Sequence, residues 1–190
     1  KAWERTVASL TFTAEQRQLL DALKGNYSIP EQIALPTYDK AVATRAASGK
    51  AIQALAAAIP NLIGGSADLA PSNKTWIDNA NAISANDFSG RNIHFGVREL
   101  AMAAIQNGIL AYGGFYAFSA TFFVFADYVR PAMRVAAISK LPAIYLFSHD
   151  SFYVGEDGAT HEPIEQLSSL RAMPNTVVIR PADPTETAQA

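Results

Sequence analysis

The 190-residue chain contains no cysteine, and only 17% of its residues are charged. The missing cysteines exclude a disulfide framework, a thiolate metal site and a cysteine nucleophile, and they suit a reducing compartment such as the cytoplasm. The 15 basic residues are scattered and nearly balance the 17 acidic ones, which argues against nucleic acid as a partner. No apolar run approaches the roughly 18 residues of a membrane span, and the first residues lack the pattern of a signal peptide. We therefore expect a cytoplasmic protein that enters no membrane.

The shortage of charge is informative in itself, because average soluble domains carry about 25% charged residues. With 49% hydrophobic residues the chain has enough apolar material for one compact domain, which excludes a disordered tail. A domain this poor in charge is expected to hide part of its surface against other domains or another subunit.

Helical and strand-like patterns alternate along most of the chain. Helical spacing of apolar residues predicts helices at residues 39–59, 98–110, 121–139 and 162–172. Short apolar runs predict strands at residues 62–63, 92–97, 142–147 and 176–179. This alternation predicts an α/β fold, a parallel β-sheet with helices on both faces, in which ligands collect at the carboxyl ends of the strands.

The two ends of the chain differ from this pattern. Residues 1–36 combine a short amphipathic run with a turn-rich segment and are interpreted as a linker, so the domain is expected to cover residues 37–190. Near the other end, Asp183, Pro184 and Glu186 form a helix start signal. Because the chain stops within two turns of that signal, we expect the domain to be truncated at its C-terminus.

Three polar clusters follow predicted strands and would line one rim of the sheet. They occupy residues 64–73, 98–99 and 149–161. Each cluster alone has a plainer interpretation as turn chemistry, since Gly, Asp, Ser and Asn dominate ordinary turns. Their convergence at one edge favours a binding site.

Several common site motifs do not fit these clusters. The neighbours His149, Asp150 and Ser151 have the residue types of a hydrolase triad, but consecutive residues that leave a strand point in different directions. A metal site made of His149, Asp157 and His161 matches no compact metal motif and is disfavoured. The glycine spacing of GGSAD is not a dinucleotide fingerprint, and no phosphate-binding P-loop motif occurs.

Two features have both a structural and a functional interpretation. Glu99 opens a predicted helix in an almost wholly apolar segment, where it is either a carboxylate favoured by the helix dipole, a partner of Arg98, or a functional acid. Phe122, Phe125 and Tyr128 follow one another at three-residue intervals on one side of a predicted helix, a pattern typical of a core stripe.

Five motifs, taken in order, resemble the central, pyrimidine-binding domain of the transketolase family. They read GGSADLAPSN, IHFGVRELAMAAIQNG, SATFFVFADYVRPAMR, SHDSFYVGEDGATHEPIEQL and RAMPNTVVIRPAD. The resemblance implies an enzyme that uses thiamine diphosphate to move a two-carbon ketol unit from a ketose phosphate to an aldose phosphate. Sugar phosphates of the xylulose 5-phosphate and ribose 5-phosphate type would be its substrates.

The resemblance assigns the cofactor contacts residue by residue. Glu99 in GVREL matches a catalytic glutamate that hydrogen-bonds N1′ of the aminopyrimidine and favours its imino tautomer, which deprotonates the thiazolium to a carbanion. Phe122, Phe125 and Tyr128 match the pyrimidine pocket, with Phe125 against the cofactor ring. Asp68 is expected near the thiazolium side.

The resemblance also assigns the substrate contacts. Arg45, Ser72 and His149 match phosphate binders, and their guanidinium, hydroxyl and imidazole donors suit that anion. Asp157 and His161 match residues that read substrate hydroxyls. His161 is a second expected catalytic residue, placed to stabilise charge near the reacting carbon and to move a proton. No residue of this chain is expected to bind a metal.

The chain also departs from the family pattern. Leu100 stands where His or Phe is expected, and residues 113–119 and 152–153 are larger than expected. Nothing in the chain matches the family's amino-terminal domain, which binds the diphosphate with its Mg²⁺ or Ca²⁺, or its third domain. The family builds its site between the subunits of a homodimer, so we expect this chain to supply the pyrimidine half of the site and to be inactive alone.

Two other interpretations stay open. A dihydroxyacetone synthase or a deoxyxylulose phosphate synthase would be a thiamine diphosphate enzyme with the same domain, although GEDGATHEP and the phosphate binders favour a transketolase. A non-catalytic assembly module is the alternative of another class. The joint presence of Glu99, Asp157 and His161 argues against it, because a scaffold has no use for such convergent polar groups.

Overall fold

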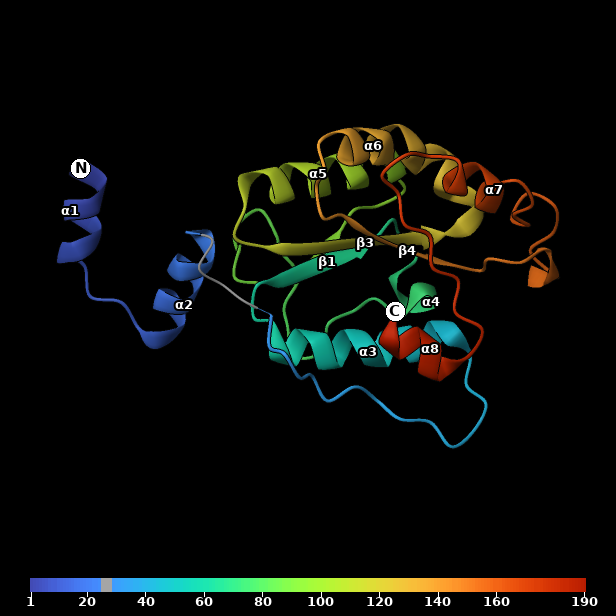
Figure 1. Ribbon diagram of the computed structural model, residues 1–190, viewed down its shortest axis with the longest axis horizontal. Coiled ribbons are helices and arrows are strands. Elements are labelled where there is room, and N and C mark those ends of the chain that lie inside the picture. Colours follow the sequence, from blue (N-terminus) through green and yellow to red (C-terminus); the bar gives the residue numbers. More distant parts are fainter. Residues whose placement is uncertain (25–28) are drawn as a thin grey trace.

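Four strands form one parallel sheet in the computed structural model, which describes residues 1–24 and 29–190 (Figure 1). In sheet order they are β2 (Asn92–His94), β1 (Leu62–Ser66), β3 (Tyr116–Phe122) and β4 (Ile144–Ser148). One face is covered by α5 (Glu99–Tyr112) and α6 (Ala126–Ile138), and the other by α3 (Thr44–Ala58) and α8 (Pro184–Gln189). The predicted α/β class, a parallel sheet with helices on both faces, is confirmed.

The central strand β1 carries two glycines where its neighbours approach most closely. A Cβ added at Gly64 would lie 2.4 Å from the carbonyl oxygen of Phe118 in β3. A Cβ at Gly65 would lie 2.0 Å from the carbonyl oxygen of Ile93 in β2. The missing side chains therefore allow both neighbouring strands to pair with β1 at this point.

Each face of the sheet has its own apolar core. Beneath α5 and α6, buried side chains form one core, which contains Met102 and Ala103 from α5, Val129 and Met133 from α6, and Phe123 from the turn between β3 and α6. On the other face, α3 packs on the sheet through Ile52, Ala56, Ile59, Leu62 and Phe118. Burial of apolar area on both faces fixes which way each strand presents its side chains.

Most predicted elements occur near their expected positions. The helix expected at residues 39–59 is α3 with a later start, and that at 98–110 is α5. The strands expected at 62–63, 92–97 and 142–147 are β1, β2 and β4, and the helix at 162–172 contains α7 (Gln166–Arg171). The start of α8 is capped as predicted, because the Asp183 carboxylate accepts a hydrogen bond from the Glu186 amide at 2.8 Å.

The helix expected at residues 121–139 was wrong at its beginning. Phe122 is the last residue of β3, a short 3₁₀ turn follows at Phe123–Phe125, and α6 begins only at Ala126. Phe122, Phe125 and Tyr128 therefore do not lie along one helix. Strand β3, which the sequence did not reveal, occupies the centre of the sheet and pairs with both β1 and β4.

The strand expected at residues 176–179 was also wrong, since no strand is assigned there in the part of the chain that the structure describes. Val178 packs against the core beneath α6, so the segment still belongs to the folded body. A groove separates the segment from the free edge of β4, which explains why no ladder of hydrogen bonds joins them.

Two further helices, α1 (Ala2–Ser9) and α2 (Ala14–Leu23), precede the sheet and lie to one side of it in Figure 1. Thr13 and Gln16 cap α2 reciprocally, which defines its start. Within the turn-rich part of the expected linker, residues 25–28 lie outside the described residues. Across the described ranges, no helix combines the length and the apolar character that crossing a membrane requires.

Candidate functional site

Two neighbouring cavities open near the carboxyl ends of the strands, and every predicted site residue lines one of them. The first, which we call the aromatic pocket, has a volume of about 500 Å³ and is lined by Ala67, Asp68, Leu69, Val97, Glu99, Phe125, Tyr128 and His161. The second, the polar groove, has a volume of about 1150 Å³ and lies along β4. Among its lining residues are Arg45, Ser72, Phe122, His149 and Asp157.

Glu99 is the first residue of α5 and brings a half-buried carboxylate to the aromatic pocket. The alternative that it pairs with Arg98 is wrong, because the Arg98 guanidinium donates instead to the carbonyl oxygen of Phe95 at 3.3 Å. Among the residues that the structure describes, Glu99 makes no hydrogen bond or ion pair. Its carboxylate is therefore available to a ligand in the pocket.

Aromatic rings form the opposite wall of this pocket. The Phe125 ring lies 6.2 Å from that of Tyr128, and the His161 ring meets Phe125 edge-on at 5.3 Å between centroids. The loop that follows β1 completes the lining with Asp68, whose φ of 63° turns the chain away from the strand. A flat ring with a polar edge suits this combination of ring faces, apolar side chains and one free carboxylate.

Phe122 lies between the two cavities. Its ring stacks on the His149 imidazole with centroids 3.6 Å apart, and it lies 6.4 Å from the rings of both Phe125 and His161. Phe122 therefore lines the polar groove with one face and supports the aromatic pocket from behind, instead of lining that pocket beside Phe125 and Tyr128.

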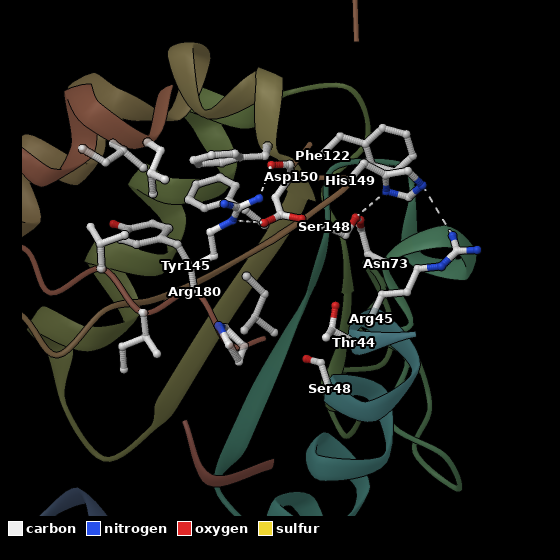
Figure 2. A pocket seen from close by; sticks show the side chains of 18 of the residues that line it. Thr44, Arg45, Ser48, Asn73, Phe122, Tyr145, Ser148, His149, Asp150 and Arg180 are labelled. Atoms are coloured by element: carbon white, nitrogen blue, oxygen red, sulfur yellow. Dashed lines mark hydrogen bonds and ion pairs between the residues drawn. The ribbon is translucent and has the colours of Figure 1, made fainter. Parts of the chain in front are cut away.

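Basic and hydroxyl groups meet in the polar groove (Figure 2). Arg45, in the first turn of α3, donates to the carbonyl oxygen of Ser72 at 3.2 Å and approaches Nε2 of His149 at 3.4 Å. Burial, followed by the charge of Arg45, lowers the pKa of His149 below its ordinary value of 6.5, against a smaller opposing effect of Asp157. A lowered pKa keeps the imidazole mostly neutral near pH 7, so Arg45 supplies the standing positive charge here.

Sequence reasoning missed Arg180, which lines the same groove. Its guanidinium forms an ion pair with Asp150 at 2.6 Å, so residues that follow two different apolar segments meet at one edge (Figure 2). The sequence did contain a signal for this residue, because Arg180 directly follows the apolar run 176–179, just as each of the other polar clusters follows an apolar run. The position of that pair also explains why His149, Asp150 and Ser151 form no triad: Asp150 is occupied by Arg180 and Ser151 accepts from the Tyr153 amide.

Asp157 and His161 come from one loop but serve different cavities. Asp157 lines the polar groove, whereas His161 lines the aromatic pocket. Within the described ranges, no cluster of three or more His, Asp or Glu side chains has the arrangement of a metal site, and His149, Asp157 and His161 form none.

A parallel α/β domain that gathers a free carboxylate, aromatic rings and basic side chains at the carboxyl edge of its sheet belongs to the class of cofactor-binding and anion-binding domains. The particular family follows from a direct match: the model of the transketolase pyrimidine-binding domain matches residues 40–190. The chain belongs to this family, and membership implies thiamine diphosphate as the cofactor.

Similar proteins agree with this assignment. A transketolase from Halalkalibacterium halodurans is 59% identical over 157 residues, which are 82% of this chain and 24% of that protein. The transketolase of Bacillus subtilis is 55% identical over 93% of this chain and 26% of its own length. The chain thus spans about a quarter of the length of the curated relatives it matches.

Solved structures share the fold. A transketolase from Leishmania mexicana superposes with a TM-score of 0.92 at 47% identity, over 98% of this chain and 28% of its own. A Pichia stipitis transketolase in complex with sedoheptulose 7-phosphate gives 0.86 at 43% identity, over 92% and 27% of the two chains. A split-gene transketolase described as an inactive β4 tetramer gives 0.59 at 30% identity, over 78% and 46%.

Proposed function

We propose that the chain forms the pyrimidine half of a transketolase active site. The complete site would transfer a two-carbon ketol unit from a ketose phosphate to an aldose phosphate. One observation carries this proposal: Glu99, Phe125 and His161 converge in an aromatic pocket beside a groove that contains Arg45 and His149. The division into a linker at residues 1–36 and a domain at 37–190 is part of the proposal.

The aromatic pocket suits the aminopyrimidine of thiamine diphosphate. Phe125 and Tyr128 offer ring surfaces for its faces, and Glu99 offers a carboxylate that can share a proton with a ring nitrogen. Asp68 also lines this pocket and would offer a polar group toward the thiazolium. When bound, the cofactor supplies the carbon nucleophile that takes up the two-carbon unit. The work of Glu99 is to hold a proton at N1′ of the pyrimidine.

The polar groove suits the phosphorylated end of a sugar. Arg45, Ser72 and His149 lie together and present a guanidinium, a hydroxyl and an imidazole, which are good phosphate ligands. Arg180 adds a second guanidinium to the groove. The sugar phosphate in the Pichia stipitis structure supports this class of substrate. Asp157 would read hydroxyl groups from the groove, and His161 would move a proton close to the cofactor.

The other half of the site belongs to the remaining domains of the complete enzyme. We place the diphosphate and its Mg²⁺ or Ca²⁺ there, because the matched relatives extend far beyond this chain. A homodimer with active sites at its subunit interface is supported by the low charge and by exposed apolar side chains on α5 and α6, namely Leu100, Ile105, Tyr128, Val135 and Ile138. The absence of cysteine suits the cytoplasm.

The 190-residue chain alone should show no ketol transfer from xylulose 5-phosphate to ribose 5-phosphate when thiamine diphosphate and Mg²⁺ are added. The reason is that its cavities offer groups for the pyrimidine and the sugar phosphate, whereas we place the diphosphate and its metal on the domains that the longer relatives add. A full-length transketolase that carries this chain as its pyrimidine domain should be active in the same coupled assay. The split-gene relative described as inactive supports this expectation.

Two outcomes of that assay would contradict the proposal. Clear turnover by the chain alone would show that it holds a whole site. A full-length enzyme that prefers formaldehyde as the acceptor would be a dihydroxyacetone synthase instead, and one with no transfer activity at all would favour the assembly module.

Binding of a phosphorylated sugar should take up a proton at His149. Its pKa is lowered in the free chain by burial and by Arg45, and a phosphate dianion beside the ring would raise it again. The phosphate loses its own second proton near pH 6 and is therefore already a dianion above pH 7. As the pH rises further, the bound form loses the proton on His149, and the KM for ribose 5-phosphate should rise by about two- to fivefold between roughly pH 7 and pH 8.5. The rise should vanish in His149→Gln. An equal pH dependence in that variant would assign the proton to another group.

A further inference from the structure

A chain of hydrogen bonds leads from the buried hydroxyl groups of Thr75 and Ser66 to the imidazole of His149. Thr75 and Ser66 join their hydroxyls at 2.7 Å, and the side-chain amide of Asn73 donates to Ser66 Oγ at 3.1 Å. Ser148 Oγ, at the end of β4, donates to Asn73 Oδ1 and lies 2.7 Å from His149 Nδ1. Figure 2 shows Asn73, Ser148 and His149 close together, with a dashed line from Ser148 to the imidazole.

The donors in this chain fix the proton on the imidazole. Ser148 has a single hydroxyl proton, and it is used in the hydrogen bond to Asn73 Oδ1. The remaining contact, between Ser148 Oγ and His149 Nδ1, then requires the ring to donate. Neutral His149 is therefore protonated at Nδ1, and its Nε2 lone pair faces Nη1 of Arg45.

Burial makes this arrangement rigid. Ser66, Asn73 and Thr75 are 2%, 5% and 1% exposed, so the amide of Asn73 cannot easily turn its oxygen away from Ser148. The ring of Phe122 stacks on one face of the imidazole, with the two ring centroids 3.6 Å apart. With Nδ1 bound below and one ring face covered, Nε2 is the nitrogen that can reach a ligand in the groove.

We propose that Ser148 and Asn73 are positioning residues that keep the proton on His149 Nδ1 and point Nε2 at the phosphate of the sugar. A ring already protonated at Nδ1 gains its second proton only at Nε2, where it can donate to a phosphate oxygen. The pair thereby strengthens the preference of the site for phosphorylated over unphosphorylated sugars. This inference rests on the proposed role of His149 in phosphate binding.

Kinetics in a full-length transketolase that carries this chain test the proposal. With hydroxypyruvate as the donor, Ser148→Ala should raise the KM for ribose 5-phosphate about tenfold, the size expected for one lost hydrogen bond to a charged group. The constants for D-ribose, which has no phosphate, should change less than about twofold. Ser148→Thr keeps the hydroxyl and should restore the ribose 5-phosphate KM. Ser9→Ala is the matched control and should leave these constants unchanged, because the Ser9 hydroxyl donates to the Thr6 carbonyl oxygen at the end of α1 and lines neither cavity.

The tautomer gives a second readout that a merely structural role would not change. Nitrogen NMR of ¹⁵N-histidine-labelled protein should report His149 as protonated at Nδ1 in the parent and as a mixture of tautomers in Ser148→Ala. Asn73→Ala removes the acceptor of the Ser148 proton, so Ser148 can donate to Nδ1 and the population should shift toward the tautomer protonated at Nε2. If the Ser148→Ala protein fails to fold, the Asn73→Ala variant becomes the decisive one.

The outcomes separate this inference from the proposed function. If His149→Ala leaves the ribose 5-phosphate KM unchanged, the phosphate role of His149 is wrong, and the inference falls with it. If His149→Ala raises that KM while Ser148→Ala and Asn73→Ala keep both the parent KM and the parent tautomer, the positioning role alone is overturned.

Discussion

Replacing Glu99 by alanine in a full-length transketolase that carries this chain should lower kcat by about a hundred- to a thousandfold. Glu99 opens α5 at the aromatic pocket and has no protein partner among the described residues, so its carboxylate is free to act on a bound pyrimidine. The loss of one positioned proton-transfer group typically costs that much. Steady-state rates with xylulose 5-phosphate and ribose 5-phosphate measure it.

The same variant should leave substrate affinity almost intact. Glu99 lies in the aromatic pocket, whereas Arg45 and His149, which we propose as phosphate ligands, lie in the polar groove. The KM for ribose 5-phosphate should therefore change less than about threefold, while the KM for thiamine diphosphate rises. This split distinguishes a cofactor role from a general loss of structure.

Two further variants make the Glu99 experiment specific. Glu99→Gln keeps the shape and a hydrogen-bonding group but cannot share a proton, so its kcat should fall nearly as far as that of Glu99→Ala. Glu15→Ala changes an exposed glutamate in the first turn of α2, and it should leave both constants unchanged. A Glu99→Ala enzyme with parental kcat would refute the central assignment of the aromatic pocket.

The sequence was a good guide wherever an element carries a local signal. Pro60 and the helical spacing before it placed α3, and the pair Asp183 and Pro184 placed the start of α8. Strand β3 lacks such a signal because six of its seven residues are buried, so apolar and polar residues do not alternate along it. The three-residue spacing of Phe122, Phe125 and Tyr128 then extended the expected helix backward into the strand.

For the candidate site as well, local sequence signals were informative, whereas the three-dimensional arrangement was not predictable from them. Motifs indicated which residues line the two cavities, since each polar cluster follows a strand-like run. They could not indicate that Phe122 lies between two cavities or that Asp157 and His161 separate, because both depend on how the loop from β4 folds back. Ser148 and Asn73 are 75 positions apart in the sequence, and only the folding of the whole sheet and its loops brings them into contact.

Substituting Gly65 by alanine should destabilise the fold by about 3 kcal/mol, the upper end of what overpacking costs. The added Cβ would lie 2.0 Å from the carbonyl oxygen of Ile93, which is backbone and cannot move aside without parting β1 from β2. For a chain of this length such a loss lowers Tm by roughly 6 to 12 °C. Thermal unfolding followed by circular dichroism measures it.

Gly108→Ala is the matched control, because it makes the same chemical change with the opposite expected sign. Gly108 lies inside α5, is exposed, and a Cβ there would have nothing within 4 Å. Alanine restricts the unfolded chain and favours the helix, so this variant should be more stable by up to about 1 kcal/mol. If both alanines shifted Tm alike, the close approach of β1 and β2 could not be what requires glycine at position 65. Since the loop bearing Ala67 and Asp68 leaves β1 just beyond that contact, parting the two strands would also displace one wall of the aromatic pocket.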